Sequence, residues 1–349
     1  MCFGSLALAP ACGSDDGGGK GGDGGGGNTG PGLQPPAPPD TGNPGTGTTP
    51  TVLAASKLFL GETDRSGNAS SSAWKSFGFD LDGLKSTKTS TNHCKLPANT
   101  PPSNKEDGDN GIDNSFGRNI LPILKSFVTA PSEEVNGAIA EGSFTIMLKM
   151  DNLDSEANQT QVSASLYGGA DLGAAPKWDG TDAWPVFPEL LNGGNINDPK
   201  VKFPNSYVTG GTWVSGSKGV VDLSVSIGGQ SISLIIQNAY VVLDVTGTGS
   251  TAKGKNGIIA GVIKTTQLVT EIEKVAGQLT DGQLCPGNPT LDGALASIKA
   301  ASDIMADGTN GSSGVECDAI SIGIGFDSEA VVLGPVADPS EPGVDPCAP

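Results

Sequence analysis

The sequence predicts a mainly β protein, an antiparallel β-sandwich of the jelly-roll kind with a few packed helices. Between Gly211 and Lys264, apolar and polar residues alternate in several consecutive runs, which is the period of strands buried on one face. Glycine-rich turns separate these runs. Gly228-Gly229 joins the first two and supplies the positive φ that a tight hairpin needs. These runs read as consecutive strands of a β-meander, so we expect a β-rich scaffold.

The predicted elements follow one another within a single β-rich domain that spans residues 51–349. The chain up to residue 50 offers almost no side chains that could be buried. A long segment between residues 168 and 205 is expected to be irregular, because glycine and proline interrupt it. Helices are expected near residues 118–129, 266–280 and 290–305. Strands are expected at residues 57–61, 74–81, 144–150, 162–166, 221–227, 232–236, 240–245, 258–263, 318–326 and 329–333.

The composition limits the partners that the protein can have. Among 349 residues there are 53 glycines and 38 acidic against 20 basic side chains, which gives a net charge of -18. Such a surface repels nucleic acid and anionic lipid headgroups and attracts cations. We therefore expect no nucleic-acid partner.

The first twelve residues, MCFGSLALAPAC, have the character of a signal-peptide end: a short apolar stretch, small residues and a cysteine. They resemble the lipobox of bacterial lipoproteins, which implies that Cys12 is lipidated, although Ala9 stands where that pattern usually has leucine. The segment lacks a basic region, so we expect the true start of the signal to lie upstream. Residues 13–50 are predicted to be a disordered Gly/Pro-rich tether. No apolar run reaches the roughly 18 residues of a spanning helix, so we expect the protein to attach to a membrane through a lipid anchor only.

The leader, the glycine-rich tract and the phrase FGFDLDG at residues 77–83 together resemble deltaproteobacterial cell-surface lipoproteins. The resemblance implies an extracytoplasmic location, at the outer membrane or cell surface, and no defined reaction.

Four cysteines follow the leader: Cys94, Cys285, Cys317 and Cys347. An even number in an extracytoplasmic chain predicts two disulfides, for which three pairings are possible. We favour Cys317 with Cys347, because a hairpin between them would bring them together, and hence Cys94 with Cys285. Zinc is a poor alternative, since there is no CxxC pair and a single histidine.

Two acidic stretches are candidates for a metal site. Asp80 and Asp82 stand two residues apart beside a glycine, and Asp107, Asp109 and Asp113 follow in a second loop rich in glycine and asparagine. This spacing lets a curled loop turn several oxygens toward one hard cation, and calcium takes such ligands. The alternative is an ordinary turn, because Asp and Asn side chains bond their own backbone.

The segment from Trp178 to Trp184 is the candidate ligand site. Two tryptophans with Asp179 and Asp182 between them could stack on a sugar ring and bond its hydroxyl groups. The alternative is that the tryptophans anchor a long loop onto the sheet. The ligand would be a glycan or a protein.

No catalytic residue is nominated. His93 is the only histidine, it adjoins Cys94, and no serine motif accompanies it. We therefore predict a lipid-anchored surface protein with a non-catalytic binding or structural role, stabilised by calcium. Two alternatives stay open: a secreted carbohydrate-active enzyme that uses paired carboxylates in residues 168–205, and an assembly factor with an exposed apolar groove.

Overall fold

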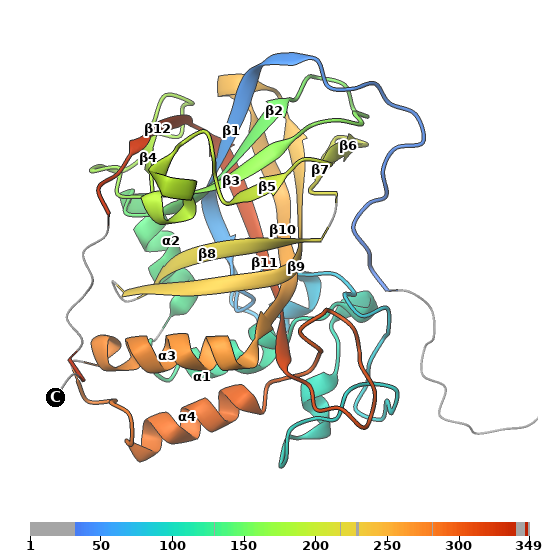
Figure 1. Cartoon of the computed structure of the whole chain (residues 1–349), viewed down its shortest axis with the longest axis vertical. Coiled ribbons are helices and arrows are strands. Elements are labelled where there is room, and N and C mark those ends of the chain that lie inside the picture. Colours follow the sequence, from blue (N-terminus) through green and yellow to red (C-terminus); the bar gives the residue numbers. More distant parts are fainter. Residues whose placement is uncertain are drawn as a thin grey trace, which may run out of the picture.

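Strand β1, Gly47–Phe59, lies in the middle of one large sheet of 12 strands. The structure is a computed structural model and describes residues 32–128, 130–216, 218–227, 230–280, 282–339 and 346–347. Figure 1 shows the sheet in the upper part of the molecule, with helices α3 and α4 stacked below it. The prediction of a mainly β fold is confirmed.

The other strands are β2 Thr145–Asn152, β3 Ala164–Gly169, β4 Ala183–Val186, β5 Val201–Phe203, β6 Tyr207–Thr209, β7 Thr212–Val214, β8 Gly219–Ile227, β9 Gln230–Thr246, β10 Lys253–Lys264, β11 Ala319–Ala330 and β12 Val332–Val336. They are ordered β12-β4-β3-β2-β1-β11-β10-β9-β7-β6, with β5 paired to β3 and β8 to β9. The pair β12–β4 is parallel and the other named pairs are antiparallel.

One hairpin of the sheet packs against the face of other strands of the same sheet. The hairpin β8–β9 crosses in front of the central strands (Figure 1). Val221 and Ile236 of the hairpin are buried in one apolar cluster with Leu148 of β2 and Leu166 of β3. The turn at residues 228–229 lies outside the described residues.

Strand β9 joins two strands that the sequence predicts separately. A register shift against β10 occurs where Asn238 adopts a left-handed conformation, with φ of 51°. Such a bulge bends a strand and lets it change partners. Gly261 lies opposite, and a Cβ there would come within 2.6 Å of the Gln237 carbonyl oxygen, so the bend requires glycine at that position.

The α-helices are α1 Leu121–Leu124, α2 Pro131–Glu141, α3 Thr265–Leu279 and α4 Pro289–Lys299. Helix α3 agrees closely with the prediction for residues 266–280. The helix predicted near residues 118–129 overlaps a π-helical turn at Phe116–Ile120, which the short α1 follows. The prediction for residues 290–305 is too long, because the chain turns after Lys299 and Ile304 bridges to Ala319. None of the described helices is long and apolar enough to span a bilayer.

The favoured disulfide pairing is wrong, although all four cysteines are bonded. Cys94 pairs with Cys317 and Cys285 with Cys347. The expected hairpin does not form, because β12 leaves β11 and pairs with β4. Meanwhile Lys95 bridges to Glu316, which places the Cys94 loop beside Cys317.

The folded domain includes residues before Thr51. Residues 32–46, predicted to be tether, lie against the domain. The Leu33 N–H donates to the Asn110 carbonyl (2.9 Å), the Tyr207 hydroxyl donates to the Pro36 carbonyl (2.6 Å), and Asn43 bridges to Gln159. The predicted lipidation site, Cys12, lies outside the described residues.

Candidate metal centre

The loop that carries Asp80 and Asp82 lies directly on strand β11. The sequence predicts a strand at residues 74–81, but the structure has a 3-10 turn at Ala73–Ser76 and then irregular chain. Phe77 is buried, and a Cβ at Gly325 of β11 would come within 2.5 Å of its ring. Glycine in β11 therefore lets the loop approach the sheet.

Asn114 fixes the second acidic loop to the first. Its side chain is 2% exposed. Its amide nitrogen lies within hydrogen-bond distance of the carbonyl oxygens of Trp74 (3.2 Å), Phe77 (2.9 Å) and Gly323 (3.0 Å), and its Oδ1 accepts from the Gly323 N–H (3.1 Å). One buried amide thus holds both loops against β11, next to Asp113.

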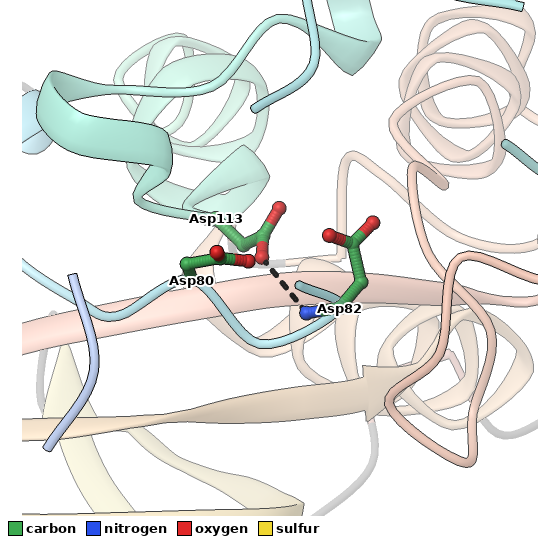
Figure 2. Close-up of side chains that lie close together, drawn as sticks. All are labelled: Asp80, Asp82 and Asp113. Atoms are coloured by element: carbon green, nitrogen blue, oxygen red, sulfur yellow. Dashed lines mark hydrogen bonds between the residues drawn. The ribbon is translucent and has the colours of Figure 1, made fainter. Parts of the chain in front are cut away.

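These contacts bring three of the predicted metal ligands together. Oxygen atoms of Asp80, Asp82 and Asp113 lie within 4.8 Å of one another. Figure 2 shows the carboxylates of Asp80 and Asp113 meeting, with that of Asp82 beside them. Asp80 is 2% and Asp113 4% exposed, and Asp82 is half-buried.

Backbone N–H groups hold each carboxylate in place. Asp113 Oδ2 accepts from Leu81 (2.7 Å) and more weakly from Asp82 (3.4 Å), as Figure 2 indicates for the latter. Asp80 Oδ1 accepts from the Gly83 N–H (2.7 Å), and Asp82 Oδ1 accepts from the Leu84 N–H (2.8 Å). Asp80 and Asp82 therefore make the turn interactions that the sequence offered as an alternative, whereas Asp113 bonds a distant loop and its Oδ1 receives no hydrogen bond from any described residue.

Two further aspartates surround this group. Asp107 Oδ2 accepts from the Ser86 N–H, and Asp303 Oδ2 accepts from the Ser321 hydroxyl (2.5 Å). Asp109, the remaining predicted ligand, is exposed and lies outside the group.

Burial in this acidic centre favours protonated carboxyl groups. Burial first, and then the charges of Asp82, Asp107 and Asp303, raise the pKa of Asp113 well above its usual range. Burial, reinforced by Asp80, raises the pKa of Asp82 to about 6. Burial, with the charges of Asp82, Asp303 and Asp80, raises the pKa of Asp107 to about 8. Burial also raises the pKa of Asp303 to about 7 against the hydrogen bonds from Ser321.

No protein cation compensates this charge in the described part of the chain. None of its ion pairs joins Asp80, Asp82, Asp107, Asp113 or Asp303 to a lysine or arginine. Buried carboxylates are ordinarily paired, protonated or bound to a metal. The residues present could therefore hold a metal ion through Asp80, Asp82 and Asp113.

The Trp178–Trp184 segment is placed differently from the acidic loops. Trp184 is 0% exposed and its indole N–H donates to the Ala170 carbonyl (2.6 Å), while the ring of Trp178 lies 5.6 Å from it. Asp182 Oδ2 accepts from the Trp178 N–H (2.8 Å), and Asp179 Oδ1 accepts from the Thr181 N–H (3.0 Å). The tryptophans anchor the loop, and both carboxylates bond within it.

Comparisons of the chain with protein-family models, with curated proteins and with solved structures found no match.

Proposed function

We propose that this chain is a lipid-anchored, extracytoplasmic surface protein with a non-catalytic binding or structural role, in which a calcium ion orders the two acidic loops. The observation that carries the calcium proposal is the meeting of Asp80, Asp82 and Asp113 from two loops, with no ion pair to a lysine or arginine of the described residues.

Calcium is the metal that this donor set fits best. Carboxylate oxygens suit hard cations, and calcium accepts six to eight oxygen ligands in a flexible geometry. The three aspartates would supply part of that shell, and backbone carbonyls or water would complete it. Zinc prefers nitrogen and sulfur ligands, which the group of three does not contain.

The test is to titrate the metal-free protein with calcium in a calorimeter and to measure its thermal unfolding with and without calcium. At a calcium concentration of 100 times Kd, a site of this kind adds about 2.7 kcal/mol to the free energy of unfolding. For a domain of this size, that corresponds to a rise in Tm of roughly 5 °C. Saturable heat with a matching rise in Tm is the expected result. Equal melting curves in calcium and in chelator would mean that these aspartates bind no calcium and serve only to stabilise the turns.

The surface location is tested separately. Changing Cys12 to serine is expected to release the protein from the membrane fraction, because a lipid on this cysteine would be the anchor. A protein that stays with the membranes after this change is held there by something else.

The carbohydrate-active enzyme receives less support from the geometry. It requires two free carboxylates beside an exposed aromatic ring. In the Trp178–Trp184 segment, Trp184 is buried and Asp182 is 9% exposed, with its oxygens bonded to backbone N–H groups. We therefore do not propose catalysis there.

A further inference from the structure

A cavity of about 550 Å³ opens between the end of β1 and helix α1, outside the acidic centre. Part of the cavity wall is formed by the π-helical turn Phe116–Ile120, which carries Arg118. Such turns are rare and often occur at functional sites. The volume lies within the range of small-molecule sites. The main lining residues are Glu62, Ala69, Trp74, Arg118, Leu121, Pro122 and Lys125.

The apolar part of the wall favours a hydrocarbon over a sugar. Leu121, Pro122 and Trp74 contribute carbon surface. Two cations already lie over the Trp74 ring, Arg118 at 5.2 Å and Lys75 at 5.8 Å from its centroid. The indole is therefore not free to stack on a pyranose, whereas an alkyl chain or a small ring can pack against the cavity wall.

The polar part of the wall offers donors for one negative charge. Lys125 Nζ lies 3.7 Å from Glu62 Oε2, and its side chain is 48% exposed. The Lys125 ammonium group makes no hydrogen bond with a described residue. Arg118 uses two of its nitrogens on Glu106, at 2.6 Å and 2.8 Å, which leaves further N–H groups of the guanidinium for a ligand.

The local charge balance also admits an anion. Each of these two cations has one carboxylate partner, Glu62 or Glu106, so the cavity is close to neutral in a protein with a net charge of -18. Glu62 Oε1 accepts from the Ser132 N–H at the start of α2 (2.7 Å), so this carboxylate is fixed by the fold. Because α2 holds Glu62 independently of Lys125, the half-exposed Lys125 ammonium can donate to an incoming anion while it stays near Glu62.

We propose that this cavity binds a small amphipathic carboxylate. Its apolar chain or ring would pack against Leu121, Pro122 and Ala69. Its carboxylate would accept hydrogen bonds from Lys125 Nζ and from an N–H of Arg118.

Three probes separate the parts of this proposal: octanoate, acetate, which lacks the apolar chain, and octanol, which lacks the charge. By calorimetry on the whole protein, octanoate is expected to bind saturably, with acetate and octanol at least about fivefold weaker. Equal affinity for octanol and octanoate, or the absence of saturable octanoate binding, overturns the proposal.

Variants locate the binding. Lys125→Gln removes a half-exposed charge and is expected to weaken octanoate binding about fivefold. Lys274→Gln removes an exposed lysine of α3 and should leave binding unchanged. Ala69→Leu fills the cavity from an exposed loop position and should abolish binding while the Tm is kept. Binding that Ala69→Leu does not reduce, or that Lys274→Gln weakens as much as Lys125→Gln, would place octanoate elsewhere and contradict the proposal.

Discussion

At the residue scale, Asp113 has two functions with opposite effects on stability. Its Oδ2 holds the first acidic loop through the N–H groups of Leu81 and Asp82. Its charge is buried at 4% exposure among other carboxylates, which is unfavourable without a cation.

The variant Asp113→Asn separates these functions. Asparagine keeps an oxygen for the two N–H donors and removes the charge. Without calcium, we expect a Tm equal to or higher than that of the native protein, because the cost of burying this carboxyl group, whether charged or protonated, has gone. The rise in Tm that calcium is expected to cause in the native protein should be absent in this variant. Thermal unfolding in calcium and in chelator measures both effects.

Asp109→Asn is the matched control, because Asp109 lies in the same loop, is exposed and stands outside the group of three. It should keep the full calcium shift. A shift that survives in Asp113→Asn or disappears in Asp109→Asn would show that the ion is bound by other residues.

The sequence identifies part of this centre. Asp80, Asp82 and Asp113 are found because aspartates beside glycine are typical of oxygen-rich loops. Asp303 is missed, since it reaches the centre through its contact with Ser321 of β11 and has no local signature. Asn114 is missed for the same reason: its contacts to Gly323 and Phe77 depend on the packing of distant segments.

At the element scale, the N-terminal segment joins the acidic centre. The Gly32 N–H donates to Asp80 Oδ2 (2.5 Å), and the Asp80 N–H donates to the Leu33 carbonyl (2.8 Å). A cation on Asp80 would therefore stabilise the position from which the predicted tether leaves the domain.

We expect calcium to slow hydrogen exchange at the Leu33 and Asp80 amides. Both amides are hydrogen-bonded in the contact between the segment and the centre, so ordering Asp80 reduces local opening. The Thr46 amide bonds Asp154 instead (2.8 Å) and serves as the internal control. If calcium does not slow hydrogen exchange at the Leu33 amide, or slows it no more than at the Thr46 amide, the N-terminal segment is not coupled to the ion.

The two disulfides should differ in their contribution to stability. Cys94–Cys317 spans 223 residues and Cys285–Cys347 spans 62. By chain entropy, the longer loop is worth roughly 5 kcal/mol and the shorter roughly 4 kcal/mol. Urea unfolding of the two double serine variants should therefore show the larger loss for Cys94 and Cys317. The reverse order would mean that local packing, and not loop length, decides.

The elements that the sequence predicts well are those with strong local periodicity. Alternation locates β8 and β10, and the apolar stripe locates α3. Helix α2 is missed because only a few of its side chains are buried, although its first residue, Pro131, and the left-handed Gly142 after it are typical of helix ends. The disulfide pairing is missed because it depends on which strand β12 meets.

At the scale of the whole molecule, the net charge of -18 opposes folding through self-repulsion, and the acidic centre places five carboxyl groups close together. Protons and a divalent cation relieve this repulsion in the same place. Stability, pH and calcium are therefore expected to be linked.

We expect the calcium-free protein to lose stability as the pH rises from about 5 to about 8. Burial raises the pKa of Asp82 to about 6, of Asp303 to about 7 and of Asp107 to about 8. An unfolded aspartate titrates near a pH of about 3.9. In this window the folded chain therefore holds more protons than the unfolded chain, and the free energy of unfolding falls with rising pH.

Urea unfolding across this pH range, with and without calcium, measures the linkage. Calcium binds the ionised carboxylates, so at saturating calcium the fall should be smaller and calcium binding should release protons. Asp107→Asn should flatten the upper part of the calcium-free curve, because it removes the group that titrates near a pH of about 8. A calcium-free curve that is level or rises would show that these carboxyl groups are already ionised in the folded protein, and that their charge is balanced without protons.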